Sequence, residues 1–504
     1  MIKFDLKYLS KQSKKLKEKG FKIGLCHGVF DIIHAGHINH FSEVKKKCDY
    51  LFVTVTEDKY VNKGPNRPVN NHYFRAQVLA SLKQVDYVGI NYAPDATTCI
   101  DLIKPDFYFK GKDYKGKRDL TRRLNKEISC IKKNKGKIIY TISPLKSSTE
   151  IINKSFSYIF DSKLKEFLSK KNKIELLNYS LQALEKIKDK KVLIIGDAII
   201  DQYDEVKPLN KPIKESILAT QFLKTDIFFG GVFAAAENLA QFCKNISICS
   251  VVGNDSDIKK NLKKIRSKYD CIILEEKFKV TTRKKRFVDN AYKRKLSEVY
   301  FMEDQLLGKQ NKSKIINFLE KKVKDFDLVI LIDYGHGFID RDIYNVLEKK
   351  SKFLSVNCQT NSANLGFNLI TKYKRADYIC IDEPELRLAT SNNRDEIEEI
   401  VTKELIKKIN CKNITITRGR NGSFSYLNKK VQNVPALISD KVIDTIGAGD
   451  VFLVITSLLY SAKTNQLITN IIGNIAGALK VDILGHSKSI SRSNFYAVIN
   501  HILK

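Results

Sequence analysis

Tryptophan and paired cysteines are missing from this 504-residue sequence. The ten cysteines stand singly and never form a C-x-x-C pair. Several lie inside apolar runs, as Cys249 and Cys380 do, where a reduced thiol acts as a small hydrophobic group. The spacing therefore indicates neither a disulfide framework nor a zinc site.

Long apolar runs are absent as well. A membrane-spanning helix needs about 20 apolar residues, whereas the longest candidate, residues 451–462, has only the length of a buried helix. The N-terminal segment lacks the charged, apolar and small-residue regions of a signal peptide. We therefore expect a cytoplasmic protein that does not bind a membrane.

Acidic residues are few relative to basic ones, which gives a formal net charge of +33. Such a balance is typical of nucleic-acid binders, but the lysines are spread along the whole chain and no basic cluster alternates with aromatic residues. A compositional bias combined with anionic substrates explains the charge better. We expect small-molecule partners and no nucleic acid.

The chain is longer than a single hydrophobic core supports, so two domains are expected. Short apolar runs alternate with helical stretches, the pattern of a parallel α/β sheet. Strands are predicted at residues 22–26, 50–55, 87–90, 107–109 and 137–140, and again at 191–196, 246–252, 328–332, 353–356, 378–381 and 414–417. The sequence therefore predicts domains at 1–150 and 191–504 with a connector at 151–190.

The connector contains no glycine or proline, and its leucines recur at helical spacing between charged residues. This pattern predicts helices packed on one face. A helix lying on a membrane surface is the alternative, but the acidic residues weaken it. The apolar face must be buried against a domain or against its copy in a second subunit, and we expect a homo-oligomer.

The first candidate site follows the first strand, where Gly28 permits a tight turn and Gly36 a close backbone approach. His34 and His37 lie in the first turn of the next helix, beside its unpaired N–H donors. This arrangement predicts an anion site at which two imidazoles stabilise charge on a nucleotide α-phosphorus. Capping histidines are one alternative. A histidine metal cluster is another, although the segment brings no carboxylate or cysteine at ligand spacing.

The residues around this site resemble the cytidylyltransferase-like superfamily, whose hallmark is H-x-G-H after a G-x-F-D strand end. They resemble most closely the nucleotidyltransferase half of bifunctional heptose-phosphate kinase/adenylyltransferases. Four further matches follow in order, at residues 63–68 with Arg75, 79–88, 105–113 and 147–151. One departure is His27, where the family more often has asparagine.

The resemblance implies that His34 and His37 bind the triphosphate and stabilise the transition state. Ser148 and Thr149 would hold the β- and γ-phosphates at a second helix start. No general base is required, because the attacking sugar phosphate is already ionised. The remaining residues implied to bind the nucleotide are Gly28, Phe30, Asp31, Lys63, Arg75, Lys110, Asp113 and Ser147.

The second candidate site is the glycine-rich run Asp444-Thr-Ile-Gly-Ala-Gly-Asp450, which opens an apolar helix. The N–H groups of Gly447, Ala448 and Gly449 would face an anion. Asp450 at the same helix start can take the proton of a sugar hydroxyl. The alternative is an aspartate that merely caps the helix.

This run looks like the D-T-x-G-A-G-D signature of the ribokinase family. The resemblance implies roles for residues spread over the domain: substrate contacts at Asp201, Gly230 and Gly231, Mg²⁺ at Asp382 and Glu385, and nucleotide contacts at Thr417, Gly419, Gly447, Ala448, Gly449 and Asn474. The stretch 281–300 resembles a β-lid on which Lys284 and Arg286 grip a substrate phosphate, or else an exposed charged strand. Departures are Ala234 in place of a substrate-binding asparagine, Asp382 in place of a metal-site asparagine, and His336 in place of a lysine.

We therefore expect an α/β protein with a Rossmann-like nucleotidyltransferase domain and a ribokinase-like doubly wound domain carrying a small β-lid. The resemblance implies a kinase that phosphorylates a sugar, polyol or sugar phosphate with ATP and Mg²⁺. The first domain would transfer a nucleotidyl group from CTP or ATP to such a phosphate. The alternative is that one domain is degenerate and acts as a ligand-binding or regulatory module. The domain order is the reverse of that in the heptose enzymes.

Overall fold

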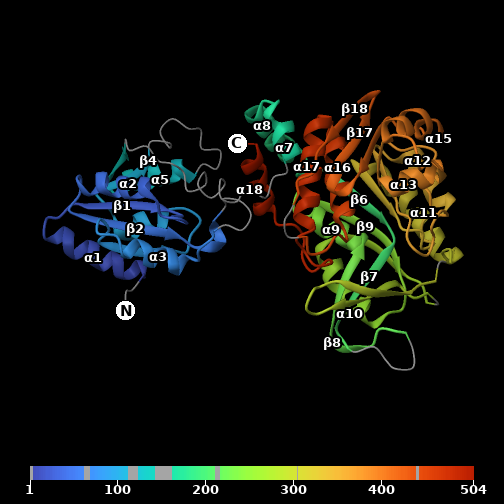
Figure 1. Cartoon of the computed structure of the whole chain (residues 1–504), viewed down its shortest axis with the longest axis horizontal. Helices are drawn as coiled ribbons and strands as arrows, with labels where there is room; N and C mark the ends of the chain where they lie inside the picture. The colour runs from blue at the N-terminus through green and yellow to red at the C-terminus, as the bar shows by residue number, and fades with distance from the viewer. Residues whose placement is uncertain are drawn as a thin grey trace. The chain divides into compact units, whose positions relative to one another are not determined.

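The computed structural model describes residues 4–61, 68–111, 123–141, 162–209, 216–277, 279–303, 305–438 and 442–503. The chain divides into two compact units, Met1–Tyr158 and Ile159–Lys504 (Figure 1). Among the helices within these ranges, none has the length and apolar character to cross a membrane. Each unit is built around its own sheet.

The first unit is a five-stranded parallel sheet in the order β3-β2-β1-β4-β5. Its strands are β1 Ile23–Gly28, β2 Tyr50–Thr56, β3 Tyr87–Asn91, β4 Phe107–Gly111 and β5 Lys137–Thr141, and its helices are α1 Leu6–Glu18, α2 Ala35–Lys45, η1 Asp58–Tyr60, α3 His72–Ala80, α4 Thr97–Ile103 and α5 Arg123–Lys133. Alternate residues of β2 point to opposite faces, so that Val53 packs with Phe41 and Leu79 while Phe52 packs with Leu9 and Ile100.

The order of this sheet reverses at β1, because β2 lies on one side of it and β4 on the other. In open parallel sheets, ligands bind outside the carboxyl ends of the strands at such a switch point. The carboxyl end of β1 is Gly28, where the histidine segment begins. The topology therefore places this segment where a nucleotide site is expected.

The second unit holds a nine-stranded sheet in the order β10-β9-β6-β13-β14-β15-β16-β17-β18, parallel except at β17 and β18. The strands are β6 Lys191–Gly196, β9 Asn245–Val252, β10 Asp270–Glu275, β13 Leu328–Asp333, β14 Leu354–Cys358, β15 Tyr378–Asp382, β16 Asn413–Thr417, β17 Ser423–Leu427 and β18 Lys430–Val434. A separate four-stranded sheet, the lid, has the order β12-β11-β7-β8. Its strands are β7 Ala198–Pro208, β8 Thr220–Gly231, β11 Thr282–Asp289 and β12 Lys295–Phe301.

Helices cover both faces of the large sheet (Figure 1). They are α7 Ser162–Ser169, α8 Lys173–Lys186, α9 Val232–Leu239, α10 Ser256–Lys268, α11 Lys309–Lys322, η4 Val323–Asp325, α12 Arg341–Lys350, η5 Ile370–Lys372, α13 Glu383–Thr390, α14 Ile397–Glu399, η6 Ile400–Leu405, α15 Ile406–Lys408, η7 Gly419–Asn421, α16 Ala448–Ser461, α17 Gln466–Lys480 and α18 Arg492–Ile502. Ile194 packs toward α9 and α16, and its neighbour Leu193 packs toward α11 and α12. The predicted α/β fold class with a β-lid is confirmed.

Helices α7 and α8, which fall in the predicted connector, belong to the core of the second unit. Leu168, Leu177 and Leu184 are buried in the same cluster as residues of α16 and α17, and α8 contacts α17 and α18. The apolar face of the connector is therefore covered within the unit and needs no second copy of the chain.

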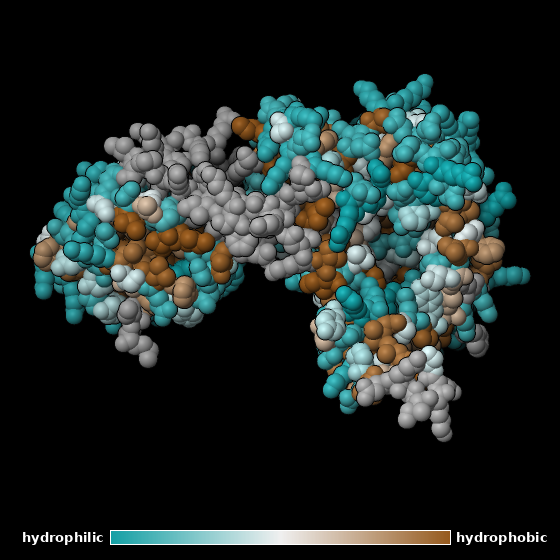
Figure 2. Space-filling model, viewed as in Figure 1, coloured by the Kyte–Doolittle hydropathy of each residue, from teal (hydrophilic) through white to brown (hydrophobic). Residues whose placement is uncertain are grey.

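The lid carries exposed large apolar side chains on β8 and β12, at Phe222, Leu223, Val299 and Phe301. Figure 2 shows apolar surface over this sheet. Exposed apolar patches mark association sites more often than plain surface. The homo-oligomer remains a prediction, and the lid offers an exposed apolar surface for it.

We expect α8 to stabilise the second unit. Leu184→Ala, at a side chain 1% exposed, should lower the free energy of unfolding by about 2–5 kcal/mol. Ile174→Ala on the same helix, where the side chain is 71% exposed, should change it by less than about 0.5 kcal/mol. Urea unfolding of the two variants measures the difference, and equal effects would show that α8 does not pack as described.

Candidate active sites

Helix α2 begins directly after the carboxyl end of β1, and His34 is its N-cap residue. The Nδ1 atom of His34 accepts a hydrogen bond from the Gly36 N–H at 3.1 Å, so neutral His34 carries its proton on Nε2. The rings of His34 and His37 lie side by side, with centroids 4.0 Å apart. Capping uses only the Nδ1 atom of His34. The proton is then on Nε2, which can donate to the predicted anion, so the two roles are compatible.

A strained turn precedes this helix. Phe30 has a φ of 49°, in the left-handed region that costs a non-glycine residue free energy. Its ring is buried and meets the edge of His37 at a centroid distance of 5.5 Å. A Cβ atom on Gly28 would lie 3.1 Å from the Phe30 ring, a tight contact that the ring could relieve only by shifting.

Asp31 and Arg75 hold the loops around the turn. The buried Asp31 carboxylate accepts hydrogen bonds from the Val69 N–H at 2.8 Å and the Asn70 N–H at 3.1 Å. The buried Arg75 guanidinium donates to four oxygen atoms, those of Asn70 O, Val29 O, Thr56 O and Asp58 Oδ1. Arg75 therefore keeps at most one of its five N–H donors for the phosphate that the sequence assigned to it.

Lys110 is also engaged by the protein. Its ammonium lies 2.9 Å from Glu127 Oε2, and both side chains are almost fully buried. Glu127 accepts further hydrogen bonds from the Tyr108 hydroxyl and the Ala96 N–H. The other predicted nucleotide contacts, Lys63, Asp113, Ser147, Ser148 and Thr149, lie outside the described residues.

The two neighbouring histidines serve the strands rather than a metal. Burial and the charge of Lys110 lower the pKa of His27 to about 4, so it is neutral, and its Nδ1 lies 2.9 Å from Thr54 Oγ1. His40 Nδ1 lies 2.8 Å from Thr141 Oγ1. Across the described ranges, no group of three or more His, Cys, Asp or Glu side chains could hold a metal ion.

In the second unit, the loop of residues 444–449, here called the anion loop, leads into α16. Gly447 is the N-cap with a φ of 77°, a conformation that favours glycine. Asp450 lies in the first turn, where its Oδ1 accepts hydrogen bonds from the Tyr334 hydroxyl at 3.0 Å and Gln359 Nε2 at 2.9 Å. Burial raises the pKa of Asp450, which makes this carboxylate a stronger base.

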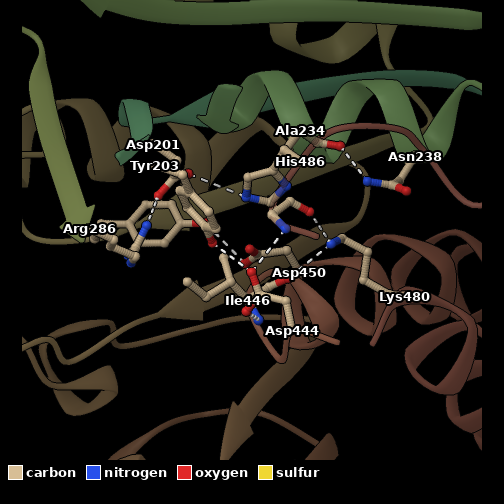
Figure 3. Close-up of polar contacts among 12 residues, drawn as sticks. Asp201, Tyr203, Ala234, Asn238, Arg286, Asp444, Ile446, Asp450, Lys480 and His486 are labelled. Carbon is tan, nitrogen blue, oxygen red and sulfur yellow. Dashed lines mark hydrogen bonds and ion pairs between the residues drawn. The ribbon is translucent and has the colours of Figure 1, made fainter. Parts of the chain in front are cut away.

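The glycine pair lies beside Asp201. A Cβ atom on Gly230 would collide with Asp201 Oδ2, and one on Gly231 would collide with the Asp197 carbonyl. Gly231 also has a φ of 57°. The glycine pair therefore packs closely against the Asp197 carbonyl and the buried Asp201 carboxylate, and its contact with a substrate stays a prediction (Figure 3 shows Asp201).

Lys284 and Arg286 on β11 point inward and are 8% and 6% exposed, so this strand is not an exposed charged one. Arg286 is paired with Asp201 and with Glu298, the latter at 2.8 Å. The Lys284 ammonium lies 5.4 Å from the Tyr300 ring centroid and 5.6 Å from that of Tyr334. No carboxylate of the described chain lies within ion-pair distance of Lys284, and burial lowers its pKa.

Asp382 and Glu385 form a capping box at the start of α13. The Asp382 side chain accepts from the Glu385 N–H, and Glu385 Oε2 accepts from the Asp382 N–H, each at 2.8 Å. Burial and the neighbouring Asp382 raise the pKa of Glu385 to about 8. A bound cation would relieve this crowding of charge, so the pair fits a Mg²⁺ ion that keeps water and phosphate as its other ligands.

The predicted nucleotide side lies at the ends of β16 and β17. Thr417 ends β16, and Gly419 follows it with a φ of 52°. The Asn474 amide donates to Ser423 Oγ and to the Val434 carbonyl, each at 3.2 Å. Asn474 therefore joins α17 to the strands, and its side chain is committed to these contacts.

Three residues without an assignment from the sequence contact the anion loop, Asp450 or Asp201: Tyr334, Lys480 and His486. His486 Nε2 lies 3.4 Å from Asp201 Oδ2, and its ring would touch a Cβ on Gly447 at 2.6 Å. Sequence motifs gave no signal for Tyr334, Lys480 and His486, because these residues are far apart in the sequence.

Where Ala234 replaces the expected asparagine, Asn238 follows one turn later, but its amide donates to the Ala234 carbonyl (Figure 3). His336 is buried.

Two family models match the chain. The model described as pfkB family carbohydrate kinase covers residues 189–466. The model described as cytidylyltransferase-like covers residues 25–154. Together they span both candidate sites.

Curated relatives match a shorter stretch. The "Bifunctional protein HldE" of a Nitratiruptor species is 40% identical over 127 residues, which are 25% of this chain and 28% of that protein. The protein of the same name from Granulibacter bethesdensis is 42% identical over 105 residues, or 20% of this chain and 21% of its own length. The chain thus spans less than a third of the length of these relatives.

Solved structures align with the chain at low identity. A ribokinase of Arabidopsis thaliana, complexed with ribose and ATP, aligns with a TM-score of 0.48 and 14% identity over 63% of this chain and 99% of its own. A ribokinase of Giardia lamblia aligns with a TM-score of 0.48 and 18% identity over 61% of this chain and 98% of its own.

A side chain at Gly230 should block the acceptor side of the second unit. We expect Gly230→Ala to displace Asp201 and to weaken acceptor binding by an order of magnitude or more, since misplacement by about 1 Å costs up to 10²-fold in rate. Gly477→Ala in α17, where a Cβ meets only one atom at 4.0 Å, is the matched control. Steady-state kinetics of both variants test this, and an unchanged acceptor KM in Gly230→Ala would contradict it.

Proposed function

Because the chain belongs to the pfkB family of carbohydrate kinases and carries a cytidylyltransferase-like domain ahead of the kinase, we propose that it is a bifunctional transferase of nucleotide-activated sugar synthesis. The second unit phosphorylates a sugar, polyol or sugar phosphate with ATP. The first unit transfers a nucleotidyl group from CTP or ATP to a sugar or polyol phosphate and releases pyrophosphate.

The proposal rests on a feature that both units share, a helix start with reactive side chains. Each has a helix that starts at the carboxyl end of its sheet and bears the reactive side chains in or beside its first turn: His34 and His37 at α2, and Asp450 at α16. A helix start binds phosphate through its free N–H groups and its dipole. A degenerate sensor would have no need of intact reactive groups at both.

In the kinase, Asp450 takes the proton of the acceptor hydroxyl as that oxygen attacks the γ-phosphorus of ATP. The bond to the bridging oxygen breaks and ADP leaves with the electron pair. Tyr334 and Gln359 orient the Asp450 carboxylate, while the amides of the anion loop stabilise the transferred phosphoryl group. Asp382 and Glu385 are the residues that would hold Mg²⁺, which supplies neutralisation of the phosphate charge when bound.

In the transferase, an oxygen of the ionised sugar phosphate attacks the α-phosphorus, and pyrophosphate leaves. His34 donates from Nε2 because its Nδ1 is occupied by the Gly36 N–H. His37, whose ring centroid lies 4.0 Å from that of His34, completes a pair of donors for the charge that builds on the α-phosphoryl oxygens. No proton has to be removed from the attacking group, so no base is needed.

The lid supports an acceptor with an anionic group. Arg286 is already neutralised by Asp201 and Glu298, whereas Lys284 meets only aromatic rings within the described residues. A buried ammonium without a carboxylate favours a ligand that brings the negative charge. A sugar phosphate or sugar acid fits this requirement better than a neutral sugar.

A screen tests the whole proposal. Sugars, polyols, sugar acids and their phosphates are incubated with the protein and either ATP or CTP, and products are identified by mass spectrometry. A phosphorylated product with ATP and a nucleotide-diphospho product with one of the two nucleotides are expected. Absence of transfer from both nucleotides to every acceptor would reject the proposal.

We expect Asp450→Asn to reduce phosphorylation by about 10²–10⁴-fold, the usual contribution of a positioned base. The nucleotidyl transfer of the same preparation should stay unchanged, because it occurs in the other unit. That second activity reports the fraction of folded protein. Kinase turnover near that of the wild type would remove Asp450 from the mechanism.

His37 should act on the transition state more than on nucleotide binding. We therefore expect His37→Ala to lower the turnover of nucleotidyl transfer by on the order of 10²–10³, as loss of one oxyanion donor does, with little change in nucleotide Kd. Single-turnover rates and equilibrium titration separate the two quantities. Equal losses in rate and affinity would reduce His37 to a binding contact.

A further inference from the structure

Lys480 and Asp444 both bind the backbone of the same two residues, Ile446 and Gly485. The Lys480 ammonium donates to the Ile446 carbonyl at 3.0 Å and to the Gly485 carbonyl at 2.5 Å. Asp444 accepts from the Ile446 N–H at 3.1 Å and from the Gly485 N–H at 2.9 Å. Figure 3 shows this arrangement, which we call the Asp444/Lys480 clamp.

The Lys480 side chain has an unusual environment for a lysine. It is 0% exposed, and no carboxylate of the described chain lies within ion-pair distance of its ammonium. Burying a charge without a partner is costly, so a lysine that only filled space would be better replaced by an apolar residue. Burial lowers its pKa, and the charges of Asp444, Asp450 and Asp201 oppose that shift.

We propose that the Lys480 ammonium is an internal cation that positions the anion loop for phosphoryl transfer, in the place that a bound monovalent cation could otherwise take. The inference rests on the proposed kinase function. Two carbonyl oxygens beside a cluster of carboxylates are the surroundings in which proteins bind a potassium or ammonium ion. Lys480 supplies the charge covalently, so the wild type needs no added monovalent cation.

The clamp connects the phosphate side of the site to the acceptor side. Ile446 precedes Gly447, whose amide is one of those proposed to face the phosphoryl group. Gly485 precedes His486, which lies 3.4 Å from Asp201. Movement at Lys480 would therefore shift the anion loop and the His486 contact together. Lys480 is a positioning residue, since it touches neither substrate directly.

The clamp also reaches the lid. Asp444 accepts from the Tyr203 hydroxyl on β7 at 2.6 Å and from the Lys295 ammonium on β12 at 2.6 Å. Burial opposes ionisation of Asp444, but these two donors hold its pKa below the usual value. Asp444 is thus a permanent anion, which makes a fixed cation at Lys480 the natural counterpart.

Chemical rescue tests the inference. Lys480→Ala leaves a space beside two carbonyls and removes the charge, whereas Lys480→Met removes the charge but keeps most of the volume. In choline buffer at constant ionic strength, kinase kcat should fall by on the order of 10² in both, as when one oxyanion donor is lost, with a smaller change in the KM for ATP. Potassium or ammonium should restore at least about tenfold in Lys480→Ala and not in Lys480→Met.

A second measurement is independent of catalysis. Potassium or ammonium, relative to choline, should raise the melting temperature of Lys480→Ala but not that of the wild type or Lys480→Met. Lys407→Ala, at an exposed lysine of α15, should behave as the wild type throughout. If Lys480→Ala does not fold, Lys480→Met decides: a loss of kcat at unchanged melting temperature supports positioning, and a wild-type kcat overturns it.

The outcomes separate this inference from the proposed function. An active wild type together with full turnover of Lys480→Ala in choline overturns the internal cation. So does an equal response of both variants to potassium. A wild type inactive with every acceptor overturns the kinase proposal instead, and the melting temperatures then decide alone whether a cation occupies the space that Lys480 leaves.

Discussion

Compensation of buried charge is the constraint on which the second unit depends. Its centre removes several carboxylates and cations from water, and each must find a partner or remain costly. Asp201 finds Arg286 of the lid. Asp444 finds the Lys295 ammonium of the lid and two backbone N–H groups. The lid, the anion loop and the segment at Gly485 are therefore joined by the same few ion pairs and hydrogen bonds of Asp444.

The two units differ in sheet order, but their proposed phosphate sites share one local arrangement. In each unit the chain passes through a residue with positive φ shortly before or at the helix start, and the first N–H groups of a helix lack partners within the helix itself. At α2 the turn contains Phe30, and at α16 it contains Gly447. Only residues at or within the first turn can reach a group bound at the helix start. This explains why His34, His37 and Asp450 are the candidate reactive residues.

The sequence was sufficient for most strands of the two parallel sheets and for both helix starts, because apolar runs and glycine-rich turns are local signals, but it did not identify β7, β8, β10, β17 or β18. It was insufficient where function depends on residues far apart. Lys480 and His486 look like ordinary residues of a lysine-rich chain, and only the fold brings them to Asp444 and Asp201. The resemblance also predicted nucleotide contacts at Arg75 and Asn474. In the structure their side-chain N–H groups donate to oxygen atoms of the protein.

In the proposed kinase, acceptor preference would depend on which inward cations of the lid are already paired with carboxylates. Arg286 is held by Asp201 and Glu298, so it offers little net charge to a ligand. Lys284 lies between two tyrosine rings, which lower the cost of its burial without neutralising it. Since Tyr334 also donates to Asp450, an anion drawn to Lys284 would lie near the reacting hydroxyl. In the kinase that we propose, the departures at Ala234 and His336 would change contacts to the sugar, whereas Lys284 would still favour an anionic acceptor.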